Sequence, residues 1–307
     1  MIVFRADLSP QSGLSHLRRC TYLAALLKKK TVVLLCCRED KKAAKFLAER
    51  NLPARFIKDP AALDLGEVKA LIFDLEIFSP ADISLLEKAR QAGTKVVQIL
   101  GSGDASQPVD IQVNGDASAL LHHKFRHFNR ARRKYRKKIK DVFINLGDLL
   151  PYRDLRRVID TLHRLRCRMK VAPGLSLKKA DKRNLMKIYP GVHFCGRSES
   201  PARAYFEADL ALVPAGEEIL EAAAVGTPAL YFCQEPGQEA LAAVWAGHQT
   251  GLRFGELEAL TIDSFRDTIA PLTLECREAM GAAGKKLVDG LGVQRFFKVL
   301  KENGIIS

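Results

Sequence analysis

The sequence predicts an α/β fold with two domains, each built on a largely parallel sheet with helices on both faces. Three observations predict it. Short apolar or β-branched runs alternate with amphipathic stretches of helix length, and this alternation restarts after residue 140. The chain has 307 residues, of which 47% are apolar, and is therefore long enough for two hydrophobic cores. Because helices that join parallel strands cover both faces of a sheet, two Rossmann-like domains are expected.

The first half of the chain contains five strand-like runs. They are IVF at 2–4, TVVLLC at 31–36, ARFI at 54–57, KALIFDL at 69–75 and KVVQIL at 95–100. One of the helices between them has clear boundary signals. Ser79 is a candidate N-cap, Pro80 suits the first helical position, and Gly93 lies just past the end. We assign residues 1–121 to an N-terminal domain.

Strand-like runs return in the second half. They are DVFINLG at 141–147, MKVAPG at 169–174, VHFCG at 192–196, ADLALVPA at 208–215 and TPALYF at 227–232. Helical stretches separate them, and a helix-rich tail runs from about Asp263 to Glu302. We assign residues 141–307 to a C-terminal, nucleotide-binding domain whose last helix is a candidate to cross back to the first domain.

A basic segment at residues 122–140 joins the two halves. It contains ten Lys and Arg residues and no acidic residue, so it carries most of the formal net charge of +14. Phe125, Phe128 and Tyr135 are interleaved with the cations, and we predict one connector helix. It is a solvated linker or a surface for anionic lipid headgroups or an acidic protein. A nucleic-acid partner is disfavoured because no RNA-binding aromatic signature or zinc finger is present.

The composition also bears on compartment and cofactors. No run of 18 apolar residues occurs and the start MIVFRAD lacks a secretory signal, so we expect a cytoplasmic protein. The seven cysteines form no Cys-x-x-Cys pair, and no histidine stands at a zinc-binding spacing from them. We therefore expect reduced thiols, no metal site and no cofactor.

A lone histidine lies where ligands collect in such a domain. Ligands of doubly wound sheets bind beyond the carboxyl ends of the strands, where helix N-termini offer unpaired N–H groups. The stretch FRADLSPQSGLSHLRRC at 4–20 indicates a strand, a loop with Gly13 and a helix that begins near Ser15, so His16 falls in the first helical turn. The helix dipole there favours a neutral imidazole that can accept a proton. A capping or surface histidine is the alternative.

The same stretch resembles the opening of a known family. FRAD at 4–7 and GLSHLRRC at 13–20 are similar to the FRxD…GxGHxxRC signature of the UDP-sugar hydrolases of spore-coat-polysaccharide and pseudaminic-acid pathways. These hydrolases are relatives of the GT-B glycosyltransferases. The similarity continues in the family's order through LIFD at 71–74, VDIQVN at 109–114 and ADLALV at 208–213, followed by Gly216, Glu221, Gly226, Pro228 and Gln238.

The resemblance implies two Rossmann-like domains that face each other across a cleft, as in GT-B enzymes, and a UDP-sugar substrate. It implies that His16 is the base that activates water for attack on the anomeric carbon, with release of UDP and without a metal. Asp7 and Asp74 become candidates for orienting His16 or the sugar, and Glu221 for binding the ribose hydroxyls. Gly13, Gly147, Gly216 and Gln238 become candidate nucleotide-binding residues.

Three turns depart from the family's pattern. AGEE at 215–218 stands where the family has Gly-Gly-Ser/Thr-Thr. It places two carboxylates near the expected diphosphate, unless both are first-turn acids that point away and are favoured by the helix dipole. GDLL at 147–150 replaces Gly-Gly-Thr-Asp, and Asp104 alone remains of a paired Asp. Three functions therefore stay open. They are a UDP-sugar hydrolase of surface-glycan or nonulosonic-acid biosynthesis, a GT-B glycosyltransferase acting near a membrane, and a binding or scaffold relative without turnover.

Overall fold

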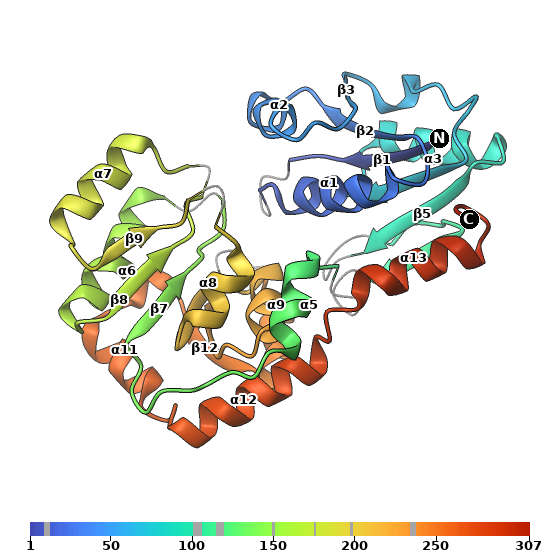
Figure 1. Cartoon of the computed structure of the whole chain (residues 1–307). Helices are drawn as coiled ribbons and strands as arrows, with labels where there is room; N and C mark the ends of the chain where they lie inside the picture. The colour runs from blue at the N-terminus through green and yellow to red at the C-terminus, as the bar shows by residue number, and fades with distance from the viewer. Residues whose placement is uncertain are drawn as a thin grey trace. The chain divides into compact units, whose positions relative to one another are not determined.

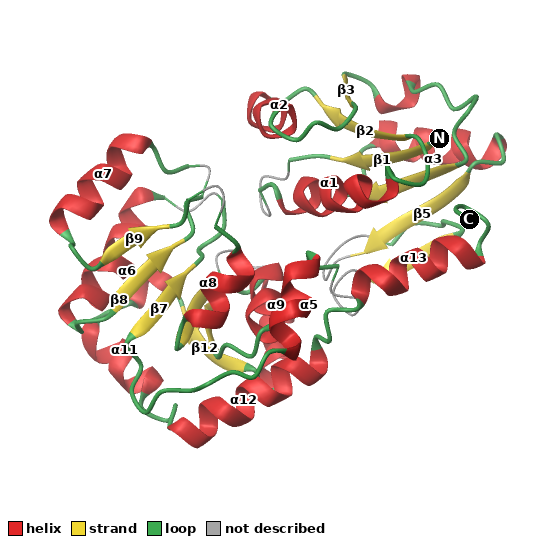
Figure 2. Cartoon of the chain, in the orientation of Figure 1, coloured by secondary structure: helices red, strands yellow, loops and turns green. Residues whose placement is uncertain are grey.

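The computed structural model describes residues 1–8, 13–100, 106–114, 120–148, 151–174, 176–196, 199–233 and 238–307. The chain forms two compact units, Met1–His122 with Leu291–Ser307 as unit 1 and His123–Gly290 as unit 2 (Figure 1). Each unit has a six-stranded sheet flanked by helices, as Figure 2 shows. The predicted α/β fold with two Rossmann-like domains is confirmed. None of the helices in these ranges is long and apolar enough to cross a membrane.

Unit 1 has the strand order β3-β2-β1-β4-β5-β6, and all neighbouring strands are parallel. Its strands are β1 (Ile2–Ala6), β2 (Val33–Arg38), β3 (Ala54–Ile57), β4 (Ala70–Asp74), β5 (Lys95–Leu100) and β6 (Ile111–Asn114). Its helices are α1 (Ser15–Leu27), α2 (Lys41–Ala48), the 3-10 helix η1 (Pro60–Ala62), α3 (Pro80–Gln91) and α13 (Gly292–Glu302). The five predicted strands are all present. The chain winds from β1 out to β3 and then returns to β4, so the winding direction reverses between β1 and β4.

The boundary signals of α3 act as predicted. Ser79 is the N-cap and forms a capping box with Asp82, while Pro80 occupies the first helical position. Gly93, just past the helix, has a φ of +69°, a left-handed conformation that glycine adopts without strain. These local signals place α3 between β4 and β5.

The last helix, α13, packs on unit 1. Val293, Phe296 and Leu300 are buried in the core that surrounds β1. Their spacing of three and four residues puts them on one helix face, and burial of each such side chain contributes roughly 1.5–3 kcal/mol. The C-terminal domain predicted over residues 141–307 therefore ends at Gly290, because this apolar stripe finds its partners in the first sheet.

Unit 2 repeats the arrangement with the strand order β12-β11-β10-β7-β8-β9, again parallel throughout. Its strands are β7 (Asp141–Ile144), β8 (Arg168–Val171), β9 (Val192–Phe194), β10 (Leu210–Pro214), β11 (Ala229–Phe232) and β12 (Gly251–Gly255). Its helices are α5 (His123–Arg130), α6 (Tyr152–Arg164), α7 (Lys179–Ile188), α8 (Pro201–Glu207), α9 (Glu217–Ala224), α10 (Gln238–Gly247), η2 (Leu257–Ala259), α11 (Ile262–Ile269) and α12 (Leu274–Leu287). Here the winding direction reverses between β7 and β10.

The basic segment 122–140 is not one connector helix, contrary to the prediction. Its helical part, α5, covers only His123–Arg130. Near its end, Asn129 Nδ2 donates to the carbonyl oxygens of Ala224, Lys285 and Val288. We call residues 131–140, which continue along unit 2 without helix, the strap. The helix ends because the side chains of the strap bind unit 2 in an extended conformation.

The side chains of residues 131–136 of the strap alternate between unit 2 and solvent. Arg133 and Tyr135 face inward, whereas Arg132 and Lys134 are exposed. Tyr135 Oη donates to the carbonyl oxygen of Gly226 at 2.8 Å, and Arg133 donates to the carbonyl oxygens of Phe206 and Ala208. This alternation is the two-residue period of an extended chain rather than the period of a helix.

Neighbouring strap residues should therefore differ in their effect on stability. Tyr135→Phe is expected to lower the free energy of unfolding by about 1–2 kcal/mol, because the Gly226 carbonyl loses its donor. Lys134→Ala should change it by less than about 0.5 kcal/mol. Urea unfolding followed by circular dichroism measures both. Equal effects of the two substitutions would contradict the inserted strap.

Candidate functional site

Polar side chains gather at both points where the winding direction reverses. Ligands of doubly wound sheets bind outside the carboxyl ends of the strands at such a point. In unit 1 this is the edge that follows β1 and β4, where α1 begins and β4 ends in Asp74. In unit 2 it is the edge that follows β7 and β10, where Asn145 and Gly216 lie. Each unit therefore has its own candidate site.

His16 and Asp74 meet at the unit 1 site. His16 is the second residue of α1, and Asp74 is the last residue of β4. The distance between His16 Nδ1 and Asp74 Oδ1 is 2.6 Å, and the side chains are only 8% and 0% exposed. Gly13, with a φ of +62°, lies in the turn that leads into α1. The structure thus brings together the predicted base and one of its two predicted orienting groups.

Arg19 is a third member of this group, and sequence reasoning assigned it no role. Its Nε and Nη2 donate to the two carboxylate oxygens of Asp74 at 2.8 and 2.6 Å. Its Nη2 also lies 3.1 Å from His16 Nδ1. Residues three apart share one face of a helix, so the spacing of His16 and Arg19 in SHLRRC is the signal that would have identified it.

The hydrogen bonds of Asp74 determine the proton arrangement of His16. Burial alone would raise the pKa of Asp74, but the Arg19 guanidinium and the His16 imidazole hold that pKa well below its usual range. An ionised carboxylate can only accept, so the shared proton belongs on His16 Nδ1, and when the ring is neutral its lone pair lies on Nε2. This tautomer is assigned from the hydrogen-bond network. It is the form that a general base needs.

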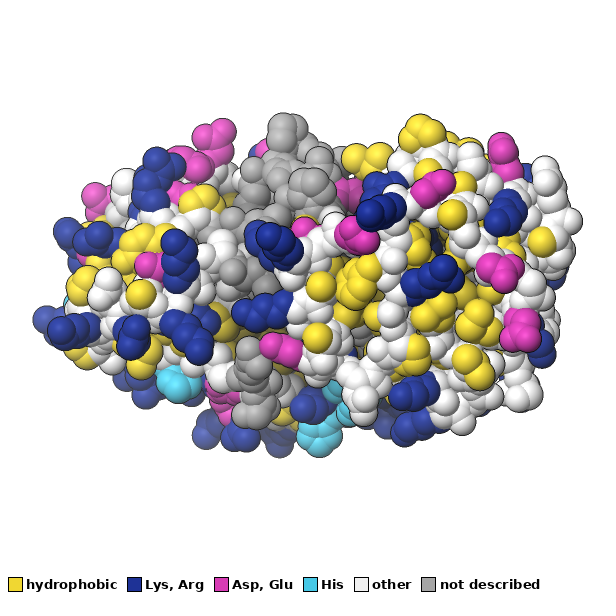
Figure 3. Space-filling model, turned by 90° about the horizontal axis from the view of Figure 1, so that it is seen from above, with side chains coloured by type: hydrophobic (Ala, Val, Ile, Leu, Met, Phe, Trp, Pro, Cys, Tyr) yellow, Lys and Arg dark blue, Asp and Glu magenta, His cyan; other side chains and the backbone are white. Residues whose placement is uncertain are grey.

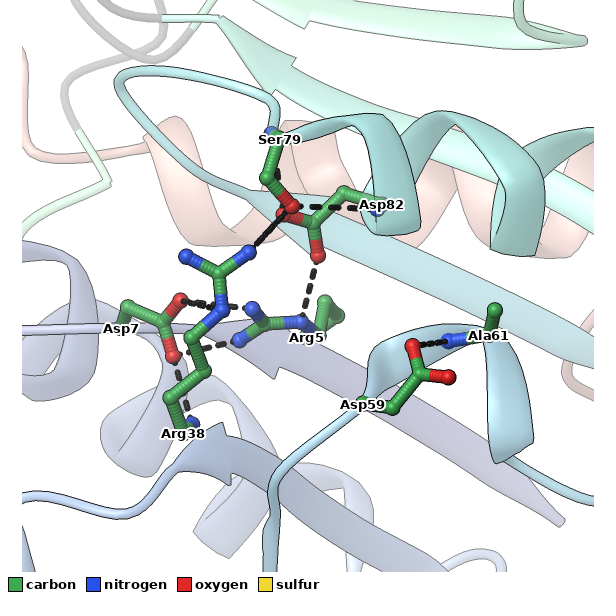
Figure 4. Close-up of polar contacts among 7 residues, drawn as sticks. All are labelled: Arg5, Asp7, Arg38, Asp59, Ala61, Ser79 and Asp82. Carbon is green, nitrogen blue, oxygen red and sulfur yellow. Dashed lines mark hydrogen bonds and ion pairs between the residues drawn. The ribbon is translucent and has the colours of Figure 1, made fainter.

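Asp7 has a different environment from the predicted one. It accepts from Nη1 and Nη2 of Arg5 at 2.5 and 2.6 Å and from the backbone N–H of Arg38 at 2.7 Å (Figure 4). Arg5 is fully buried, and its Nε donates to Asp82 at 2.9 Å. A buried guanidinium needs such partners because an unpaired buried charge is strongly destabilising. Asp7 therefore ties β1 to β2 and compensates Arg5, and it does not orient His16.

The unit 2 site is built around a buried tyrosine. Asn145, just after β7, donates from Nδ2 to Tyr205 Oη at 2.9 Å. Tyr205 is fully buried, and burial together with the carboxylates of Glu221 and Glu218 raises the pKa of its phenol well above the usual value. A hydrogen bond between Tyr205 and Glu221 is among these causes. The phenol thus accepts a hydrogen bond from Asn145 and donates one to Glu221. The second bond holds the Glu221 carboxylate, the predicted ribose-binding group, at this edge of the sheet.

Sequence reasoning missed Tyr205. PARAYFE at 201–207 shows only the pattern of a short helix that buries an aromatic side chain. Nothing in that pattern distinguishes a phenol that packs from a phenol that also carries two hydrogen bonds.

A glutamate carboxylate of the protein lies at the N-terminus of α9. Gly216 is the N-cap, and Glu217 and Glu218 form the first turn. A Cβ atom on Gly216 would lie 3.0 Å from Glu218 Oε2, so the Glu218 carboxylate folds back beside the Gly216 backbone. Helix N-termini favour anions. Here the carboxylate lies where the resemblance would place a diphosphate.

The remaining predicted residues lie at the same edge or outside the described ranges. Gly147 follows β7 and has a φ of +75°. The turn at Gly174 packs tightly against it, because a Cβ atom on Gly174 would lie 2.6 Å from the carbonyl oxygen of Gly147. Gln238 is the first residue of α10 and is partly buried. Asp104, Leu149 and Leu150 are outside the described residues. Among the residues that are described, no three His, Cys, Asp or Glu side chains are arranged to hold a metal ion.

Several solved structures share the fold of the whole chain. MurG of Acinetobacter baumannii is 15% identical, with a TM-score of 0.66 over 98% of this chain and 99% of that one. The calicheamicin glycosyltransferase CalG4 is 11% identical, with a TM-score of 0.64 over 98% of both chains. HepE of Anabaena, solved in complex with UDP-glucose, is 12% identical, with a TM-score of 0.53 over 98% of this chain and 100% of that one.

These similarities establish a GT-B glycosyltransferase-like fold. By sequence, the chain matches no protein family and no curated protein. The comparisons therefore support the GT-B part of the resemblance and give no support to its hydrolase part.

Proposed function

We propose that the protein transfers a sugar from a UDP-sugar donor to an acceptor hydroxyl, with His16 as the general base. One observation carries the proposal. His16 contacts a buried, ionised carboxylate at 2.6 Å, at the edge of the sheet where doubly wound folds bind ligands. The glycosyltransferase-like fold supports the reaction type, and the UDP-glucose complex of HepE supports the class of donor.

The proposed chemistry assigns a role to each member of the unit 1 group. His16 Nε2 takes the proton of the acceptor O–H while that oxygen forms a bond to the anomeric carbon. The bond between the anomeric carbon and the diphosphate oxygen breaks, and UDP leaves with the electron pair. Asp74 stabilises the imidazolium that forms and fixes the ring orientation. Arg19 acts through Asp74, because its two hydrogen bonds keep that carboxylate ionised.

Unit 2 is proposed to bind the nucleotide. Glu221 can accept two hydrogen bonds from the ribose diol, and Tyr205 holds it in place. Gly147 and Gly216 expose backbone N–H and C=O groups as candidate contacts, and Gln238 remains a candidate contact at the start of α10. Glu218 opposes the diphosphate, so the affinity for UDP is expected to be low.

Two other functions rest on specific observations. The resemblance of FRAD at 4–7 and GLSHLRRC at 13–20 to UDP-sugar hydrolases favours water as the acceptor, with the same base and the same leaving group. The carboxylate at the N-terminus of α9 favours a binding relative without turnover.

Release of UDP separates these functions. The full chain is incubated with UDP-linked amino sugars and hexoses, with and without a panel of glycan and lipid-linked acceptors. Release that requires an acceptor is expected and indicates transfer, whereas equal release without an acceptor indicates hydrolysis. Binding of UDP without release from any donor would favour the scaffold and contradict both reactions. A chain that neither binds UDP nor releases it would overturn the nucleotide-sugar proposal.

A further inference from the structure

Cationic side chains gather on two helices of unit 2. Residues 151–191, which include α6, β8 and α7, contain twelve Lys and Arg residues and three acidic residues. Both helices lie on one face of the sheet, because β7, β8 and β9 follow one another across it in chain order. Tyr189 joins them, since its Oη donates to Asp160 of α6 at 3.2 Å. We call the solvent side of α6 and α7 the α6–α7 face.

The centre of this face is a row of three cations on α7. Lys179, Arg183 and Lys187 are spaced by four residues, so they share one side of the helix, and all three are exposed. In the described ranges of the chain, none of their side chains forms a hydrogen bond or an ion pair. Like charges at this spacing destabilise a helix. An anionic partner would remove this repulsion.

The acidic residues of the two helices compensate α6 more than α7. Asp154 lies near Arg153 and Arg157, and Asp160 pairs with Arg164. On α7 the single acid, Asp181, accepts from the backbone N–H of Lys178 at the start of the helix. The row on α7 therefore keeps its full positive charge.

Apolar side chains accompany these cations. Met186 and Ile188 of α7 are 48% and 51% exposed, which is unusual for large apolar residues in this chain. Figure 3 shows dark-blue Lys and Arg side chains around yellow hydrophobic ones at the left end of the view, where α7 lies. Helices that lie on membrane surfaces combine basic and exposed apolar side chains in this way. A surface that binds single-stranded nucleic acid usually has exposed aromatic side chains on which bases stack. Among the described residues of α6 and α7, no Tyr, Phe or Trp is fully exposed, and Tyr152 is half-buried.

We propose that the α6–α7 face docks on the surface of a membrane that contains anionic phospholipids, with Lys179, Arg183 and Lys187 at the headgroups. The proposal does not depend on the proposed function. The sequence suggested such a surface at residues 122–140, but Arg133 and Tyr135 of that segment bond to unit 2. The exposed residues of the strap are all Lys or Arg, whereas exposed Met186 and Ile188 accompany the cations of α7.

Co-sedimentation of the full chain with vesicles tests the proposal. The wild type is expected to bind an equal mixture of phosphatidylcholine and phosphatidylglycerol and to leave phosphatidylcholine alone unbound. The triple change Lys179→Glu, Arg183→Glu, Lys187→Glu should weaken binding about 100-fold, because each basic residue near an anionic membrane contributes about fivefold. Binding should also fall steeply as salt is added.

The strap provides a matched control. Lys134→Glu, Lys137→Glu, Lys138→Glu reverses the same number of charges on exposed residues of the same unit and should weaken binding by no more than about threefold, through screened long-range repulsion. Circular dichroism and a Gln version of the α7 triple variant show whether a loss of binding reflects unfolding. UDP binding should be the same in all variants, so a failure of the nucleotide-sugar proposal is seen separately.

Several results would overturn the docking proposal. One is a strap variant that loses vesicle binding while the α7 variant keeps it. Another is a wild type that binds neither vesicle at low salt, or binds both equally. A third is displacement of the wild type from vesicles by duplex RNA or DNA whose binding requires the α7 row. That result would assign the α6–α7 face to nucleic acid.

Discussion

Replacing His16 with Asn is expected to lower the rate of UDP release by roughly 10² to 10⁴-fold. The Asn amide can still donate a hydrogen bond to Asp74, but it cannot accept a proton at the pH of the reaction. Arg19 continues to pair with Asp74 in the variant, so the free energy of unfolding should change by no more than about 1 kcal/mol. Steady-state release of UDP from the best donor measures the first effect, and urea unfolding measures the second.

His193 supplies the control for this substitution. Its side chain is 67% exposed on β9, so His193→Asn changes a histidine that contacts neither candidate site. This variant should release UDP at the wild-type rate. If His16→Asn does so as well, His16 is not the base and the contact with Asp74 is structural.

Most strands were predictable from the sequence because they lie in the centre of parallel sheets. Such strands are buried on both faces and appear as short continuous apolar runs, as ALIFD of β4 does. The edge strand β12 was not predicted, because GLRFG has glycine at both ends and few apolar side chains. Its Gly251 is needed for another reason. A Cβ there would lie 2.2 Å from the carbonyl oxygen of Ala229 in the adjacent strand.

The parts that were mispredicted depend on distant contacts. The charge pattern of residues 122–140 is compatible with a helix. The strap is extended because it bonds to unit 2, for example through the carbonyl oxygens that accept from Arg133 and Tyr135. The bound of the C-terminal domain at residue 307 was also wrong, although the last helix was a candidate to cross back to the first domain, because α13 packs into the core around Phe296 in unit 1. No local pattern contains this information.

The candidate site shows the same division. His16 and Asp74 could be predicted because the fold places the ends of β1 and β4 side by side. The partner of Asp7 could not be predicted. FRAD at 4–7 is equally compatible with a carboxylate that faces a ligand and with one that compensates the charge of the buried Arg5. Tyr205 acts through tertiary hydrogen bonds that leave no trace in a single sequence.

The double change Glu217→Ser, Glu218→Thr is expected to tighten UDP binding by about tenfold to a hundredfold. A carboxylate about 5 Å from a phosphate costs on the order of 1 kcal/mol when both are solvated and about 3 kcal/mol in a partly buried site. The wild type should therefore bind UDP with a dissociation constant nearer millimolar than micromolar. Calorimetric titration of UDP into both proteins measures the two constants.

The single variants show which carboxylate is responsible. Glu218 folds back beside Gly216, so Glu218→Thr should account for most of the gain and Glu217→Ser for little. Asp263→Ser is the control, because Asp263 lies in the first turn of α11 and is 90% exposed. It should not change UDP binding. Removal of a first-turn acid costs a helix about 0.3–1 kcal/mol, so tighter binding despite this loss cannot arise from a more stable helix.

The outcome of this titration also distinguishes an active glycosyltransferase from a binding relative without turnover. If the wild type binds UDP at micromolar concentration and the double variant binds no better, the Glu218 carboxylate moves aside when UDP arrives, and the obstacle to turnover disappears. If binding tightens and UDP release from the donor rises with it, the carboxylate limits an otherwise intact catalytic group at His16. If binding tightens but no donor is cleaved, the deficiency lies in unit 1, and the pairing of His16 with Asp74 is not sufficient for catalysis.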